Sequence, residues 1–173
     1  PHLKILVLEF GGSDNSPCKQ IPAAISYPMN MNKFDWGYKA EPESTLNGRS
    51  LVCPRGKVIG GSSSINGMIY VRGNAGDYNQ WAESGAKGWD YPDVLPYFQR
   101  MEASLGGNSE FRGKSGPLKI THGKRDNPLH NAFVKATEQA GYAYTDDYNG
   151  FRQEGFGPAD MTVWKGSRFS TAK

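Results

Sequence analysis

Residues 60–64 carry the residue types best suited to holding a phosphate group. Gly60 and Gly61 lack the Cβ atom that would keep a ligand away from the backbone, so their amides can approach a large anion. Ser62 and the two serines after it add hydroxyl groups that can cap a helix or bind phosphate oxygens. A Gly-Gly-Ser-Ser run alone is more often a flexible turn, so the surrounding elements must decide between the two interpretations.

Glu9 follows an unbroken apolar run, residues 5–8, which is typical of a strand buried on both faces in a parallel sheet. A Glu at the end of such a strand binds ribose hydroxyls in dinucleotide folds; otherwise it is a solvated strand end. Gly11 and Gly12 favour the ribose role. The strand and G-x-G-x-x-G turn that should precede Glu9 are absent, and residues 166–173 contain no closing element. We therefore expect a piece of a longer protein.

The segment between these motifs predicts an irregular excursion followed by two helices. Residues 13–50 contain several prolines and scattered aromatic residues, which indicate a covering, lid-like loop. Residues 74–84 and 88–102 predict short helices. The second begins after Asp90 as N-cap, with Pro92 in its first turn. Its apolar positions are expected to be buried; they are Val94, Leu95 and Phe98.

The C-terminal part of the chain predicts one strand and one further helix. Residues 115–123 alternate in polarity like a strand. Asn127 is a suitable N-cap and Pro128 a suitable first helical residue, while Gly141 is suited to ending the helix. One face of this helix is apolar and is expected to build a core; it carries Leu129, Phe133, Ala136 and Ala140.

Residues 56–79, GKVIGGSSSINGMIYVRGNAGDYN, resemble the first signature of the glucose-methanol-choline (GMC) family of FAD-dependent oxidoreductases. Residues 5–12 resemble the second strand of that family with its ribose-binding Glu, and residues 88–102 resemble the helix after the signature. Residues 145–173 are similar to the choline dehydrogenase branch. The resemblance covers essentially the whole chain, and a motif of this length is far more specific than a lone glycine triplet.

The resemblance implies a site for FAD. Residues 60–63 would present amides at a helix N-terminus to the pyrophosphate, because the helix dipole favours negative charge there. Residues 66–69 would run along the flavin ring; the alternative is that residues 65–70 are merely the buried first turns of a helix. We expect the cofactor-binding residues to be Glu9, Gly60, Gly61, Ser62, Ser63, Asn66, Gly67, Met68 and Ile69.

The family also implies how the cofactor is held and what it does. Members that tether the flavin carry a His at the position of Ile65, which has no nucleophile, so we expect non-covalent FAD. The implied reaction is oxidation of a primary, choline-like alcohol to an aldehyde by hydride transfer to the flavin. The catalytic base of the family is a His in the C-terminal portion, so we expect no catalytic residue in this chain. His122 and His130 are expected to be surface or helix-capping residues.

The expected fold class is α/β, as part of a Rossmann-like, GMC-type FAD-binding domain in residues 1–120 that includes the excursion 13–50. Residues 121–173 are expected to start the substrate-binding region. The first βαβ glycine motif and the C-terminal catalytic part of the family are absent from the sequence.

Composition limits the partners of the 173-residue chain. Its 20 basic and 17 acidic residues are interleaved and give a net charge of +3, so we expect no nucleic-acid surface. No apolar run is long enough for a bilayer, and Cys18 and Cys53 lack metal-ligand spacing. We expect a cytoplasmic protein with an alcohol substrate and an electron acceptor, through which it could also contact the inner membrane. The alternative function is a non-catalytic module that binds a nucleotide or a protein.

Overall fold

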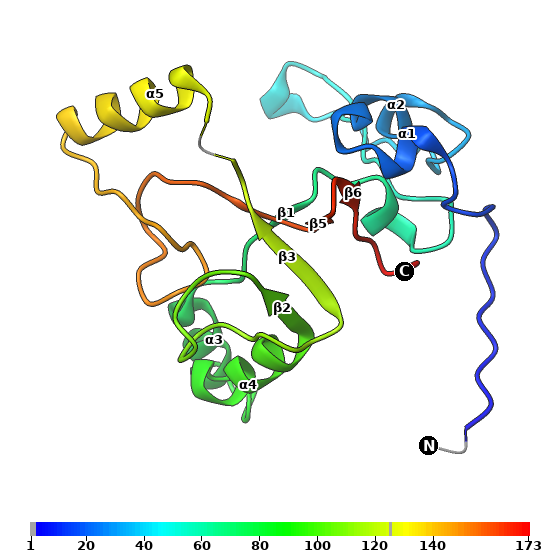
Figure 1. Ribbon diagram of the computed structural model, residues 1–173. Coiled ribbons are helices and arrows are strands. Elements are labelled where there is room, and N and C mark those ends of the chain that lie inside the picture. Colours follow the sequence, from blue (N-terminus) through cyan, green and yellow to red (C-terminus); the bar gives the residue numbers. More distant parts are fainter. Residues whose placement is uncertain (1–2, 125) are drawn as a thin grey trace. The chain divides into compact units, whose positions relative to one another are not determined.

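The chain divides into two units in the computed structural model, which describes residues 3–124 and 126–173 (Figure 1). Residues 3–68 and 165–173 form the first unit, whose elements are α1 (Pro17–Gln20), η1 (Pro22–Ala24), α2 (Ser26–Asn30), η2 (Ser44–Leu46), η3 (Gly61–Ser64) and β6 (Ser167–Arg168). Residues 69–164 form the second unit, whose elements are β1 (Ile69–Tyr70), α3 (Ala75–Glu83), α4 (Tyr91–Met101), β2 (Glu102–Ser104), β3 (Leu118–His122), α5 (Pro128–Gln139), β4 (Asp160–Met161) and β5 (Val163–Trp164). The mixture confirms the predicted α/β class. The predicted domain boundary between residues 120 and 121 concerns the whole protein and stays a prediction.

The first unit is built around a small apolar cluster and a buried lysine. Phe34, Val58 and Ile65 form the cluster. Lys19 is buried beside it, with its Nζ 3.9 Å from the centre of the Phe34 ring and donating to the Ser13 carbonyl at 2.8 Å. Burial lowers the pKa of the Lys19 ammonium group. The core of this unit therefore contains a cation as well as apolar side chains.

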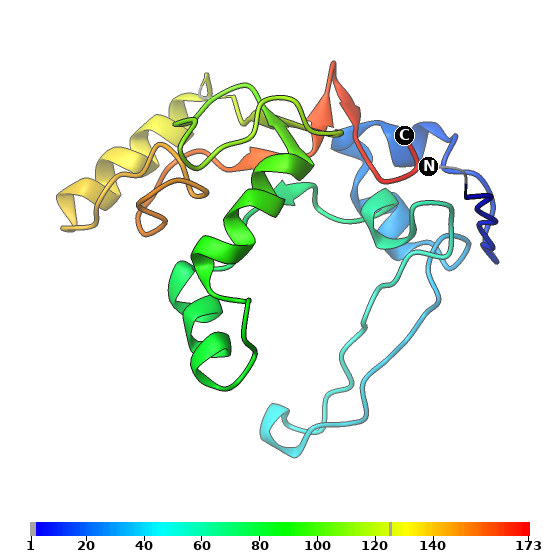
Figure 2. The same ribbon diagram turned by 90° about the horizontal axis from the view of Figure 1, so that it is seen from below.

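The excursion at residues 13–50 begins with short helical turns. It continues into an extended arm, residues 35–56, which ends six residues beyond the excursion (Figure 2). The two sides of the arm are joined by the antiparallel bridges Asp35↔Gly56, Lys39↔Val52 and Glu43↔Arg49. Asn47 and Gly48 turn the chain at the tip with φ angles of 56° and 73°. Four prolines limit regular helix in the excursion. Its predicted irregularity is confirmed, whereas a lid function stays a prediction.

Residues 5–8 do not form the predicted strand. They run as an extended trace with exposed side chains, and even Val7 is 69% exposed (Figure 1). A strand needs neighbouring backbone to satisfy its N–H and C=O groups, and no described residue pairs with this run. Backbone pairing begins only at Gly12.

The second unit contains a four-stranded sheet in the order β1-β4-β3-β2. Strand β3 runs parallel to β2, with Ala103 opposite Lys119, and antiparallel to β4, with Thr121 opposite Met161. Strand β4 pairs antiparallel with β1. Ile120 in the middle of β3 is fully buried. The strand predicted within residues 115–123 is confirmed.

Helices α3 and α4 confirm the two predicted helices and lie side by side (Figures 1 and 2). Asn74 caps α3 by accepting from the Gly76 N–H at 2.8 Å, and Asp90 caps α4 by accepting from the Asp93 N–H at 3.2 Å. The predicted burial of Val94, Leu95 and Phe98 is wrong, since all three are only partly buried. Val94 and Phe98 border an open pocket of about 600 Å³ with aromatic walls.

Helix α5 begins and ends as predicted but does not build a core. The Asn127 Oδ1 atom accepts from the Leu129 N–H at 2.9 Å, and Gly141 follows the helix with a φ of 86°. However, Leu129 is 79% exposed and Phe133 is 56% exposed. Figure 1 shows α5 standing away from the four-stranded sheet. Phe133 packs against Phe156, with ring centroids 5.7 Å apart.

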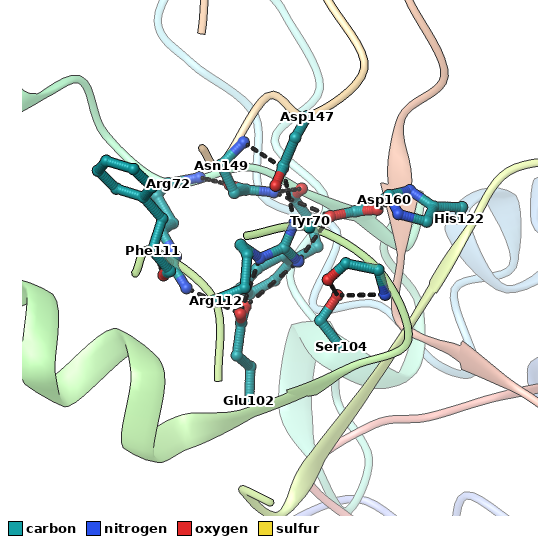
Figure 3. A network of polar contacts seen from close by, with 12 residues as sticks. Tyr70, Arg72, Glu102, Ser104, Phe111, Arg112, His122, Asp147, Asn149 and Asp160 are labelled. Carbon is teal, nitrogen blue, oxygen red and sulfur yellow. Dashed lines mark hydrogen bonds and ion pairs between the residues drawn. The ribbon is translucent and has the colours of Figure 1, made fainter. Parts of the chain in front are cut away.

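A buried network of ion pairs joins the strands of the second unit (Figure 3). Glu102 Oε1 lies 2.8 Å from Arg112 Nε and 2.9 Å from Arg72 Nη2. Arg112 also pairs with Asp147 at 2.6 Å and with Asp160 at 2.7 Å. Burial by itself lowers the pKa of Arg112, but its hydrogen bond to Glu102 and the three carboxylates outweigh burial and raise it. The centre of this unit is therefore polar, and its charges are paired.

His122 and Asn149 extend this network. His122 Nδ1 lies 2.7 Å from Asp160 Oδ1, so His122 is not simply a surface residue as predicted. Asn149 donates to the Tyr70 carbonyl at 3.1 Å and accepts from the Arg72 N–H at 2.8 Å. Asn149 also donates to Asp160 Oδ2 at 3.2 Å. The turn that carries Asn149 is therefore bonded to both β1 and β4.

Candidate functional site

The segment after Glu9 pairs with the residues just before the glycine-serine loop of the first unit, which is residues 60–64. Gly12 forms a parallel bridge with Val58, and its carbonyl accepts from the Ile59 N–H at 3.0 Å. Gly11 packs so closely that a Cβ atom there would overlap the Lys57 carbonyl oxygen. Two motifs that are about fifty residues apart in the sequence are thus adjacent in space.

Gly60 and Gly61 turn the chain at the start of the loop. Their φ angles are 84° and 56°, in the left-handed region that favours glycine. A Cβ atom on Gly61 would meet nothing within 4 Å, so this part of the backbone is open to a ligand. Gly60 is crowded, since a Cβ atom there would lie 2.5 Å from Ser64 Oγ. The approach of an anion to these amides stays a prediction.

The predicted helix N-terminus behind this loop is wrong. Gly61–Ser64 form only one 3₁₀ turn, η3, and the next α-helix begins at Ala75. The left-handed Met68, with a φ of 63°, redirects the chain before strand β1. The alternative of buried first helical turns at residues 65–70 is equally wrong. A macrodipole is therefore unavailable, and any anion here must be held by individual amides and side chains.

The serine hydroxyls shape the loop. Each hydroxyl bonds to the backbone of the loop or of the residues just before it. Ser62 Oγ accepts from the Gly56 N–H at 3.0 Å. Ser63 Oγ donates to the Gly60 carbonyl at 2.6 Å, and Ser64 Oγ donates to the Ile59 carbonyl at 2.8 Å. Ser63 Oγ also accepts from the Thr171 N–H at 3.1 Å. A role in binding phosphate for Ser62 and Ser63 stays a prediction.

Arg168 is a residue of this site that the sequence analysis missed. Its side chain is 1% exposed and donates to backbone carbonyls of the loop and of α1. Burial lowers the pKa of its guanidinium group. Backbone carbonyls are present at every residue, so no pattern of side chains could have predicted this partner set.

Two hollows of the first unit have basic side chains in their walls. One, of about 310 Å³, is lined by Met29, Pro54, Arg55, Ser62, Ile65, Asn66 and Gly67. The other, of about 270 Å³, is lined by Gly12, Ser13, Asn15, Ser16, Lys19, Lys33 and Phe34. Each hollow combines glycine backbone with a basic side chain, Gly67 with Arg55 in the first and Gly12 with Lys33 in the second. Such a lining suits an anionic cofactor.

The predicted residues divide between the two units. Glu9, the loop at residues 60–63, and Asn66, Gly67 and Met68 belong to the first unit, whereas Ile69 opens β1 in the second. Glu9 is exposed, and its Oε1 atom accepts from the Gly11 N–H at 2.7 Å. Asn66 and Gly67 are exposed, while Met68 is buried.

We also searched residues 3–124 and 126–173 for a metal site and for a membrane-spanning helix. Within them, no group of three or more His, Cys, Asp or Glu side chains could hold a metal ion. No helix there has both the length and the apolar character needed to cross a bilayer. Cys18 and Cys53 are free thiols.

Comparison with known proteins identifies relatives along nearly the whole chain. The profile of a family described as GMC oxidoreductase matches residues 11–173. The chain is 60% identical to an oxygen-dependent choline dehydrogenase of Brucella anthropi and 58% identical to one of Sinorhizobium fredii. Each match covers 97% of this chain and 31% of the relative. The chain therefore spans about a third of the length of these curated relatives.

Solved structures show the same fold. Pyridoxine 4-oxidase from Mesorbium loti superposes with a TM-score of 0.88 at 31% identity, over 95% of this chain and 32% of that one. Formate oxidase from Aspergillus oryzae has a TM-score of 0.81 at 24% identity, over 95% and 30% of the two chains, which supports the fold alone. The family profile covers far more than half of the chain and agrees with these likenesses, so the chain belongs to the GMC oxidoreductase family.

Proposed function

We propose that this chain forms part of the FAD-binding portion of an oxidoreductase that converts a primary alcohol, such as choline, to the aldehyde. The observation that carries this proposal is the pairing of Gly12, three residues after Glu9, with Val58, two residues before the glycine loop. A dinucleotide-binding site needs a ribose-binding carboxylate next to a backbone that admits the pyrophosphate. The 60% identity to a choline dehydrogenase supports choline as the first alcohol to test.

The residues of this chain would bind and orient the cofactor. Glu9 would accept hydrogen bonds from ribose hydroxyls, the amides of residues 60–63 would face the pyrophosphate, and residues 66–69 would face the flavin ring. FAD, when bound, supplies the hydride acceptor for oxidation of the alcohol. The base that removes the hydroxyl proton is expected elsewhere in the whole protein, as is contact with the electron acceptor. Membrane association through that acceptor stays a prediction.

We further propose that FAD is bound without a covalent bond. Ile65 stands where tethering members of the family carry a His, and its alkyl side chain has no nucleophile. It is 2% exposed, packed with Phe34 and Val58, and forms part of the wall of the larger hollow. At this position the chain offers the cofactor apolar contact only.

The test uses the purified whole protein. Its visible spectrum should show flavin bands that bleach when choline is added without oxygen, and pyridoxine serves as the comparison alcohol. Acid precipitation should leave the flavin in the supernatant. A folded protein without flavin bands would favour the non-catalytic nucleotide-binding or protein-binding module instead. Flavin in the pellet would contradict non-covalent binding alone.

A further inference from the structure

Arg168 holds the glycine-serine loop through backbone oxygen atoms. Its Nη1 donates to the Ser63 carbonyl at 3.2 Å and to the Asn66 carbonyl at 2.8 Å, and also to Asn66 Oδ1 at 2.9 Å. Its Nε donates to the Lys19 carbonyl at 2.8 Å. A planar guanidinium can hold several acceptors in a fixed arrangement, whereas an ammonium group cannot. One side chain thus fixes both ends of the turn from Ser63 to Asn66.

The charge of Arg168 has no counterion within the described residues. None of the carboxylates in residues 3–124 and 126–173 forms an ion pair with it. Its Nη2 atom is buried and has no hydrogen-bond partner among those residues. Arg112, which is similarly buried, differs from Arg168 because it contacts three carboxylates. An unpaired buried cation is costly, so its placement calls for a compensating negative charge nearby.

The contacts of Arg168 also set the direction of an amide. In a planar trans peptide the C=O and the following N–H point in opposite directions, and the chain has no cis peptide among the described residues. Because Arg168 draws the Asn66 carbonyl toward itself, the Gly67 N–H points away from the guanidinium. Gly67 is exposed and lines the hollow of about 310 Å³. The amide is therefore presented as a donor on the side of the turn that a ligand can reach.

We infer that Arg168 is a positioning residue of the cofactor site, which orients the Gly67 amide toward the bound FAD and adds positive charge behind the loop. This inference rests on the proposed function. Arg168 is 1% exposed and would act without touching the cofactor. It acts through the turn that it holds and through its field, which is strong where water is excluded.

The test compares three variants of the whole protein. Arg168→Lys keeps the charge but loses the planar fork, and Arg168→Met loses both. Ser167→Ala is the matched control, because Ser167 lies in the same strand and contacts Gln20 at 3.0 Å and not the loop. The measurements are the FAD dissociation constant of the apoprotein, the visible spectrum of the bound flavin and the thermal stability of the apoprotein.

We expect both Arg168 variants to bind FAD roughly 10- to 100-fold more weakly, with a shifted flavin spectrum, while Ser167→Ala matches the parent. Parental affinity and spectrum together with lower apoprotein stability would overturn the inference. If neither Arg168 variant folds, the inference also fails, since Arg168 would then be a residue of the fold. Absence of flavin from the parent protein would instead refute the proposed function.

Discussion

At the scale of single residues, Glu9 is held by its own chain. Its carboxylate accepts from the Gly11 N–H at 2.7 Å and remains exposed, so one oxygen is oriented while the other can still bind a ligand. Because Gly11 is in turn packed on Lys57, the position of the carboxylate depends on the loop beside it. Ribose binding and pyrophosphate binding would therefore be coupled.

Glu9→Ala in the whole protein should weaken FAD binding by roughly 10- to 100-fold, because a charge-assisted hydrogen bond to ribose is lost. Glu9→Gln retains an acceptor oxygen and should lose less affinity. Turnover at saturating FAD should change little in either variant. Glu41→Ala, which removes an exposed carboxylate of the arm, is the control. Unchanged affinity with collapsed turnover would show that Glu9 does not bind ribose.

At the scale of elements, the two neighbouring glycines should respond differently to the same substitution. Gly11→Ala should destabilise the protein by about 1–3 kcal/mol, because the new methyl group would overlap the Lys57 carbonyl and separate the paired segments. Gly12→Ala should be tolerated, since a Cβ atom there meets nothing within 4 Å. Chemical denaturation of the two variants measures the difference. Equal stabilities would show that the segment is not packed as described.

The three helices that the sequence predicted correctly have ends governed by neighbouring residues. Asn74, Asp90 and Asn127 cap helices through bonds to residues two or three positions away, so a local pattern is sufficient. Two predictions were wrong: the strand at residues 5–8 and the helix that should begin behind the loop. Both depend on backbone far away in the sequence, which a local pattern does not describe. For the site, Glu9 and the loop were identified by residue type, whereas Arg168 was missed.

At the scale of the whole molecule, stability should depend on pH in the alkaline range through Tyr70. Burial raises the pKa of the Tyr70 hydroxyl above its ordinary value of 10.0. The folded protein then holds the proton more tightly than the unfolded chain, so the stabilisation is complete below pH 10 and is lost as pH rises through the folded pKa. Tyr70→Phe should remove this part of the slope in denaturation series above pH 10. If the slope of stability against pH above pH 10 is the same in Tyr70→Phe, other groups cause the pH dependence.

Arg168 and Thr171 complete the loop from far along the chain, and this sets an order of events during protein synthesis. Ser63 is 105 residues ahead of Arg168. At synthesis rates of about 5–20 residues per second, the ribosome needs roughly 5–20 s to make that interval. During this time the nascent loop lacks the contacts to Arg168 and Thr171. If the loop binds FAD as proposed, capture of FAD by the finished loop follows translation of this segment.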